Sequence, residues 1–332
     1  MNNTIFFGYQ AILLPYKKHS YYTGITDKNT ICKVAPYNKG EMKLLPKLME
    51  DNISKKYLVE LVGFASYDTR MPRNIPKKTM SFINYLISLK DREKPQVFTS
   101  KYNFSFLIFK NGGKDLYEIK NDISCGKKNY FTKDTEYKTQ KMIRDLIDGL
   151  KYIHSKSICH FDIKPENITF DSNTETFKYI DFGLAEDFPF KTYLRKGPRG
   201  TMEYIPFSTN DIKLLSQFTA LLPYIPCDDW TKGPHGLWNH IHYGNDVSRN
   251  TSHISSSIYK VDVYALGRTI KCFLDTVCIS TGCLIVNSCF YKKMIEPKVF
   301  KRVNLLETEI SLPYKIFDLI EEYEESSCCF PW

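Results

Sequence analysis

Long hydrophobic runs and an N-terminal export signal are both missing from this sequence. The apolar start, residues 4–16, has no positively charged stretch before it, which argues against a secretion signal. The apolar stretch 272–290 is interrupted by Asp275, Ser280 and Asn287, so it reads as the end of a core helix and its loop and not as a membrane span. We therefore expect an intracellular, cytoplasmic protein without a membrane partner.

Paired cysteine motifs and long runs of one charge are also missing. The ten cysteines are scattered, and no C-x-x-C pair accompanies Cys272, Cys278, Cys283 and Cys289. Free thiols in a reducing compartment are the expectation, and a zinc site at these four is the alternative. The formal net charge is +9, but no run of like charges is long enough for a nucleic-acid-binding arm. We expect a lysine-rich solvated surface and no nucleic-acid partner.

The composition that remains is that of a globular protein. Hydrophobic residues make up 42% and charged residues 25% of 332 residues, enough for one large or two small cores. Residues 30–34 alternate as a strand does, and residues 104–109 form a short apolar run typical of a buried strand. From 142 to 153 apolar residues recur at three- and four-residue steps, which predicts a helix with one buried face. The fold class is therefore predicted as α+β, with strands before about residue 110 and helices after it.

Two short motifs carry groups that phosphate chemistry needs. Residues 160–167 read H-F-D-I-K-P-E-N, and residues 181–183 read D-F-G. Together they supply two carboxylates, one amide and one ammonium group. Transfer of phosphate from Mg-ATP to a hydroxyl needs a carboxylate that accepts the proton of the alcohol, and oxygen ligands for magnesium.

Both motifs resemble those of the eukaryotic-type serine/threonine protein kinase family, whose catalytic loop reads H-R-D-x-K-x-x-N and whose metal loop reads D-F-G. The resemblance implies a bilobal protein-kinase-like fold, with an N-lobe at residues 1–110, a C-lobe at residues 111–332, and ATP and Mg²⁺ as cofactors. The alternative to this interpretation is that both motifs occur by chance. The composition is similar to that of kinases of large DNA viruses, since it is rich in lysine, asparagine, isoleucine and tyrosine. This similarity would place the protein in a host cytoplasm or a virion.

The resemblance also implies a role for each residue of the two motifs. Asp162 would orient the substrate hydroxyl and accept its proton. Lys164 would meet the γ-phosphate and offset charge in the transition state. Asn167 and Asp181 would hold magnesium, which prefers hard oxygen ligands. His160 is expected to pack under the loop as a structural residue.

Upstream, Lys33 resembles the lysine of the third strand that grips the α- and β-phosphates. Its expected partner is Glu41, because Leu44 and Leu48 follow at helical spacing and would face the sheet while the glutamate faces the cleft. The interval between the two is shorter than is usual in the family, and Glu50 is a second candidate. The alternative for Lys33 is an ordinary lysine at a strand edge, and the alternative for Glu41 is a surface carboxylate.

The rest of the nucleotide site is predicted from the segment that resembles the hinge between lobes. Backbone groups of Ile108 to Lys110 would bond the adenine edge, and Asp115 could reach the ribose or be an exposed turn carboxylate. The G-x-G-x-x-G-x-V register of the family leaves only Gly8, so a side chain intrudes where close backbone approach to the phosphates is expected.

Downstream, residues 200–204 read G-T-M-E-Y and resemble the segment that receives the substrate peptide. The resemblance implies that the hydroxyl of Thr201 bridges Asp162 and Lys164. Asp262 begins a D-V-Y-A-L-G run similar to the helix at the core of the large lobe, where it would brace the backbone of the catalytic loop.

Three departures from the family pattern shape the expected function. Phe161 replaces the arginine that reads a phosphate on the activation segment, so we predict activity without such phosphorylation. The A-P-E motif reads Pro206-Phe207-Ser208 and lacks its glutamate. The insert at about 209–258 contains histidines and acids. Its three interpretations are an irregular loop without a specific role, a loop that docks a partner protein, and a metal site.

The function expected from these residues is ATP- and Mg-dependent phosphorylation of serine and threonine hydroxyls in a protein substrate. A pseudokinase that binds a partner as a scaffold is one alternative, favoured by the degenerate glycine loop. A small-molecule kinase of related fold is the other, but the G-T segment favours a peptide substrate.

Overall fold

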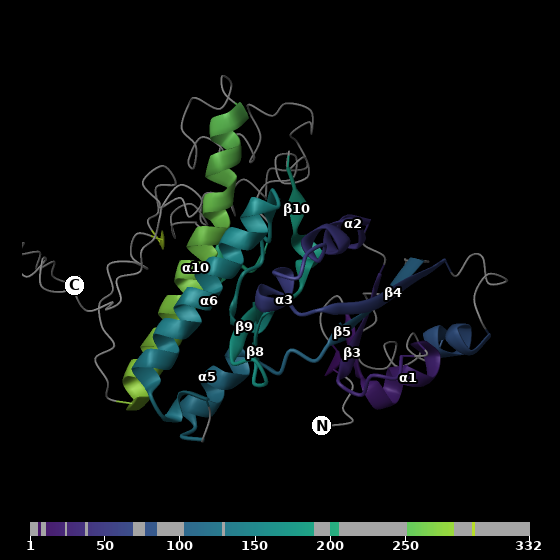
Figure 1. The fold of residues 1–332 in the computed structure, drawn as a ribbon, viewed down its shortest axis with the longest axis horizontal. Helices are drawn as coiled ribbons and strands as arrows, with labels where there is room; N and C mark the ends of the chain where they lie inside the picture. The colour runs from purple at the N-terminus through teal and green to yellow at the C-terminus, as the bar shows by residue number, and fades with distance from the viewer. Residues whose placement is uncertain are drawn as a thin grey trace, which may run out of the picture. The chain divides into compact units, whose positions relative to one another are not determined.

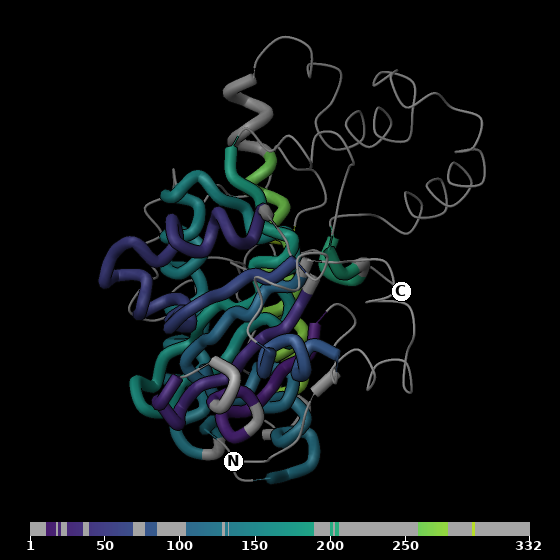
Figure 2. The backbone as a smooth tube through the Cα atoms, turned by 90° about the vertical axis from the view of Figure 1, so that its right-hand side faces the viewer, coloured from purple at the N-terminus to yellow at the C-terminus, as the bar shows by residue number. Residues whose placement is uncertain are grey.

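The computed structural model describes residues 6–7, 11–23, 25–36, 39–68, 77–84, 103–127, 130–188, 200–205, 251–281 and 294–295. The chain divides into two compact units, residues 1–113 and 114–332, whose elements are labelled in Figure 1. Figure 2 draws the backbone as a tube, coloured from purple at the N-terminus to yellow at the C-terminus.

The first unit is built on a five-stranded antiparallel sheet in the order β1-β2-β3-β5-β4. Its strands alternate as a half-buried sheet requires, with Ile12 and Leu14 buried and Leu13 39% exposed. Phe104 and Phe106 extend the same core. The strands are β1 (Phe6–Phe7), β2 (Ile12–Pro15), β3 (Thr30–Pro36), β4 (Leu61–Asp68) and β5 (Asn103–Lys110).

Helices α1 (Tyr16–Thr23), α2 (Lys39–Leu48) and α3 (Ser54–Tyr57) and a helix at residues 77–84 complete the first unit. In α2 the leucines at 44, 45 and 48 are all at most 1% exposed, because their spacing places them on one face. Glu41 lies in the first turn of this helix.

The second unit is mostly helical, with α5 (Leu116–Ser124), α6 (Thr135–Ser155) and α10 (Thr251–Thr281). Helix α6 contacts both α10 and strand β9, and Figure 1 shows α6 and α10 side by side. The short elements are β6 (Lys114–Asp115), η2 (Tyr130–Thr132), β7 (Ile158–Cys159), η3 (Pro165–Asn167), β8 (Ile168–Asp171), β9 (Thr176–Tyr179), η4 (Phe182–Leu184), β10 (Glu186–Asp187) and η5 (Met202–Tyr204).

Two small sheets position the loops of the second unit. Strands β6, β8 and β9 form one antiparallel sheet, and β7 pairs with β10 in another. The β8–β9 turn is closed locally, since the carboxylate of Asp171 accepts a hydrogen bond from the backbone of Asn173. Residues 160–167 connect β7 to β8, so each end of this loop is anchored in a sheet.

The predicted α+β fold class is confirmed, with a β-sheet in the first unit and helices in the second. The strands expected at 30–34 and 104–109 lie in β3 and β5, and the helix expected at 142–153 lies in α6. Of the predicted insert, residues 251–258 begin α10. Gly8, the rest of the insert and the helix expected at 313–324 lie outside the described residues. Over the ranges that the structure describes, no helix is long and apolar enough to cross a bilayer.

Candidate active site

Asp162 is the centre of a hydrogen-bonded group in the second unit. Its Oδ1 accepts bonds from the backbone N–H of Thr201 at 2.9 Å and from the Thr201 hydroxyl at 2.8 Å. The ammonium group of Lys164 donates to the same hydroxyl at 2.8 Å and lies 3.3 Å from Asp162 Oδ2. The Thr201 hydroxyl therefore lies between Asp162 and Lys164 and fixes the rotamers of both.

Asn167 is oriented by the same carboxylate. Its Nδ2 donates to the backbone oxygen of Asp162 at 2.8 Å and to Asp162 Oδ2 at 3.0 Å. Because both acceptors select the amide nitrogen, the amide orientation is determined by this network. The amide oxygen Oδ1 is thereby turned away from Asp162, as a ligand for a cation requires.

The β8–β9 hairpin brings Asp181 to the same end of its sheet as Asn167. Ile168 pairs with Tyr179, and the N–H of Ile180 donates to the backbone oxygen of Asn167 at 3.0 Å. Asp181 lies just after the end of β9 and is exposed. Its backbone is left-handed, with φ of 62°, so the chain turns away from the strand direction at this residue.

His160 anchors the loop at residues 160–167 to the segment after β9. Its Nε2 lies 2.9 Å from the backbone oxygen of Ile180, which requires a proton on Nε2, so Nδ1 accepts the N–H of Asp162 at 3.3 Å. The ring is buried and contacts the ring of Phe182 at 4.8 Å between centroids. His160 links the two motifs as a structural residue.

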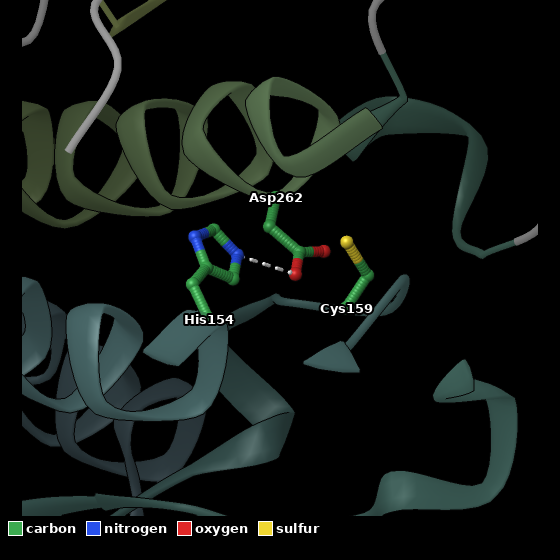
Figure 3. A group of neighbouring side chains, drawn as sticks. All are labelled: His154, Cys159 and Asp262. Atoms are coloured by element: carbon green, nitrogen blue, oxygen red, sulfur yellow. Dashed lines mark hydrogen bonds and ion pairs between the residues drawn. The ribbon is translucent and has the colours of Figure 1, made fainter. Parts of the chain in front are cut away.

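Asp262, fully buried on α10, braces the loop from the other side. Its oxygens accept the backbone N–H groups of His160 at 2.7 Å and Phe161 at 2.8 Å, and His154 Nε2 lies 3.1 Å away. Figure 3 shows Asp262 pointing from α10 to His154 and to the neighbouring Cys159. The closeness of the three side chains would suit a metal ion. However, burial raises the pKa of the Cys159 thiol well above its usual value, which disfavours the thiolate that a metal needs.

Lys33 and Glu41 form an ion pair in the first unit. Lys33 Nζ and Glu41 Oε1 are 2.7 Å apart, and the two side chains are only 12% and 4% exposed. The lysine comes from the middle of β3 and the glutamate from the first turn of α2. A buried pair of this kind restricts the position of the Lys33 ammonium group.

Comparison with known proteins gives the family to which this sequence is similar. Residues 95–207 match the sequence model of the protein kinase domain. This segment therefore has the sequence of a protein kinase domain, and the chain is similar to eukaryotic-type protein kinases. It is similar to calcium-dependent protein kinase 6 of Plasmodium berghei, with 31% identity over 191 residues, which is 56% of this chain and 11% of that protein.

Two further relatives support the same family. Smooth-muscle myosin light chain kinase of Gallus gallus is 33% identical over 125 residues, 37% of this chain and 6% of that protein. Serine/threonine-protein kinase mos of Patiria pectinifera is 35% identical over 82 residues, 25% of this chain and 21% of that protein. The similarity thus spans at most about a fifth of the length of these three relatives.

The residues expected to bind adenine lie in the sheet of the first unit. Ile108 lies inside β5, where it pairs with Cys32 on one side and Gly63 on the other. The N–H of Lys110 donates to the backbone oxygen of Glu60 at 2.9 Å, and its side chain pairs with Asp27. The backbone of Asn111, directly after the strand, likewise donates to the backbone oxygen of Asn29 at 2.9 Å. An adenine contact by backbone groups of Ile108 to Lys110 stays a prediction.

Asp115 caps a helix in this kinase. Its Oδ1 accepts the backbone N–H of Glu118 at 2.7 Å, which satisfies one of the free N–H groups at the start of α5. Burial raises the pKa of Asp115 to about 6, and the carboxylates of Glu118 and Glu166 add to the rise. A ribose contact of Asp115 stays a prediction.

His154 is a structural residue of the site that sequence reasoning missed. It lies four residues after Leu150 on the buried stripe of α6, and a polar residue on an apolar stripe signals a buried partner. That signal was present in the sequence, but the partner, Asp262, lies 108 positions away.

We expect Gly200→Ala to destabilise the kinase by about 1–3 kcal/mol and to lower its activity. Gly200 has φ of 115°, and a Cβ there would lie 2.3 Å from the backbone oxygen of Phe161. Relief of this clash must move the backbone beside Thr201, whose N–H and hydroxyl hold Asp162. Thermal unfolding and initial rates measure both effects.

The matched control is Gly126→Ala. Gly126 also has a positive φ, 65°, but no atom lies within 4 Å of its added Cβ. It therefore isolates the backbone cost from the clash. Equal losses in the two variants would show that the close approach to Phe161 does not matter.

Proposed function

We propose that this kinase transfers the γ-phosphate of ATP, with Mg²⁺, to serine and threonine hydroxyls of protein substrates. The observation that carries the proposal is the arrangement around one carboxylate: Asp162 held by Thr201, with Lys164 and Asn167 at its second oxygen. A positioned base beside an ammonium group is what phosphate transfer to an alcohol needs from a protein.

Asp162 is the proposed base. Thr201 orients its carboxylate at Oδ1 and Asn167 orients it at Oδ2, and this carboxylate would accept the proton of the substrate hydroxyl. Lys164 lies 3.3 Å from Oδ2 and would offset negative charge on the transferring phosphate. Thr201 positions both groups, and its place in the G-T-M-E-Y segment puts this contact next to the expected peptide substrate.

Asn167 and Asp181 fit a magnesium site. They supply an amide oxygen and a carboxylate at one end of the β8–β9 hairpin, and hard oxygen ligands are what magnesium prefers. When bound, the ion neutralises charge on the phosphates. In the first unit, Lys33 with its partner Glu41 is assigned to the α- and β-phosphates of ATP.

Serine/threonine specificity is the finer part of the proposal. A lysine two residues after the catalytic aspartate resembles serine/threonine kinases, and its contact with Thr201 gives that lysine a defined position. The name of the mos relative also states this specificity for that protein. The partner is therefore proposed to be a protein substrate, and docking of a further protein at the insert 209–258 stays a hypothesis.

The test is phosphate transfer by the purified full chain. We expect incorporation of labelled γ-phosphate from ATP into casein or myelin basic protein, recovered as phosphoserine and phosphothreonine, and loss of incorporation when EDTA removes magnesium. Nucleotide binding without transfer to any acceptor would favour the scaffold alternative. Transfer to small alcohols but not to proteins would favour a small-molecule kinase.

A further inference from the structure

Helices α5 and α10 are joined by a contact between an amine and a thiol. Lys120 on α5 donates from its Nζ to the Sγ of Cys272 on α10, 3.4 Å away, although the two residues are 152 positions apart in the sequence. Both residues are half-buried. A nitrogen and a sulfur that can each act as a nucleophile therefore lie side by side in the second unit.

Three other thiols that the structure describes have different surroundings. Cys32 and Cys159 are buried, and burial raises the pKa of both thiols, which keeps them protonated and unreactive. Cys125 is exposed at the end of α5. Cys272 combines partial exposure with an amine at contact distance, and this combination is what a cross-link between nitrogen and sulfur requires.

Tyr204, in η5, contacts the same sulfur. Burial raises the pKa of the Tyr204 hydroxyl, and the neighbouring Cys272 adds to the rise, so the hydroxyl stays protonated and acts as a donor. The backbone N–H of Tyr204 donates to the backbone oxygen of Thr201 at 2.9 Å. The sulfur of Cys272 is thus one contact away from the segment that holds Asp162 in place.

We propose that Lys120 and Cys272 form a reversible sulfenamide cross-link when the kinase meets hydrogen peroxide. Peroxide takes two electrons from the sulfur: the thiol becomes a sulfenic acid, the O–O bond breaks and one water leaves. The neutral amine of Lys120 then attacks this sulfur, a nitrogen–sulfur bond forms, and the sulfenic oxygen leaves as the second water. In total, one thiol, one amine and one peroxide give one sulfenamide and two waters. A dithiol reductant reverses the reaction and restores both side chains while it becomes a disulfide.

The cross-link changes two measurable properties of the kinase. Because α5 and α10 already pack against each other, a covalent bond between them restricts the unfolded chain far more than the folded one and stabilises the fold. The bond also draws the sulfur toward Lys120 and away from the Tyr204 hydroxyl, which loosens the segment around Thr201. This second effect rests on the proposed function, since it is measured as a rate of phosphate transfer.

The test treats the purified full chain with hydrogen peroxide and maps its peptides by mass spectrometry. We expect a peptide pair joined at Lys120 and Cys272 that is about 2 Da lighter than its two parts, because two hydrogens are lost, and that is absent after reduction with dithiothreitol. The Tm of the cross-linked protein should rise by about 5 °C or more, the effect of closing a long loop. The rate of phosphate transfer should fall by about two- to tenfold, the effect of one lost hydrogen bond, and recover after reduction.

Two variants serve as matched controls. Lys120→Arg keeps a positive charge and N–H donors beside the sulfur, but a guanidinium stays charged and offers no free amine. This variant should fold as the wild type does and lose the linked peptide, the rise in Tm and the peroxide-dependent fall in rate. Cys125→Ser removes the exposed thiol at the end of α5 and should form the link as the wild type does.

Three results would count against these expectations. Cys272 recovered only as a disulfide or a sulfenic acid, with no peptide joined to Lys120, would overturn the cross-link, and so would an equal rise in Tm in the Lys120→Arg variant. A linked peptide with an unchanged rate of transfer would overturn the effect through Tyr204. A wild type that forms the link but transfers no phosphate before or after reduction would instead overturn the proposed function.

Discussion

Replacement of Asp162 by Asn will lower the rate of phosphate transfer by about 10²- to 10⁴-fold, the usual contribution of a positioned general base. The side chain keeps its shape, and its carbonyl oxygen can still accept both bonds from Thr201. What is lost is the proton acceptor at the second position. The variant should therefore fold and bind nucleotide as the wild type does.

The geometry around Oδ2 explains why no neighbour can take over. Asn167 donates to that oxygen, and Lys164 lies 3.3 Å from it. Both are donors, so the amide nitrogen that Asp162→Asn places there would face two donors and accept nothing. We expect kcat to carry the loss and the Kd for ADP to stay within about twofold.

The control for this prediction is Asp275→Asn. Asp275 is an exposed carboxylate on α10 that pairs only with Lys271 among the contacts described for it, and an exposed pair contributes little. The Asp275→Asn variant should transfer phosphate at the wild-type rate. If the Asp162→Asn variant transfers phosphate at the wild-type rate, Asp162 does not act as the base.

Replacement of Asp262 by Ala will lower the free energy of unfolding by about 3–5 kcal/mol, as removal of one member of a buried charged network does. The carboxylate is fully buried and accepts from two backbone N–H groups of the catalytic loop and from His154. Ala leaves all three donors buried without an acceptor, and each costs about 1–3 kcal/mol.

The Asp262→Ala substitution should also lower the rate of phosphate transfer. The two N–H groups belong to His160 and Phe161, which directly precede Asp162. Without their acceptor the loop backbone is free to move, so the activity of the remaining folded protein should fall as well. Denaturant unfolding measures the first effect and initial rates measure the second.

Asp275→Ala on the same helix is the matched control. Its side chain is 55% exposed, and such substitutions usually change stability by less than about 0.5 kcal/mol. A loss below about 1 kcal/mol in the Asp262 variant would mean that the loop is held by other contacts.

The sequence predicted most local structure of this kinase because local structure follows spacing. The alternation at 30–34 and the helical period at 142–153 fall in β3 and α6, and the leucines that follow Glu41 are buried in α2. Such patterns depend only on residues a few positions apart. The strand expected at 104–109 extends to Lys110 in β5, because the end of this strand depends on its pairing with both neighbouring strands.

The chemical groups of the site were readable from the sequence alone: the acids at 162 and 181, the amide at 167 and the ammonium at 164 follow from two short motifs. Only the tertiary structure decided how they are held. The bond from Thr201 to Asp162 spans 39 positions and that from His154 to Asp262 spans 108. It also decided that Lys120 lies against Cys272, 152 positions away. Residue types and spacing determine what a side chain can donate or accept, whereas its partner depends on which distant segments pack beside it.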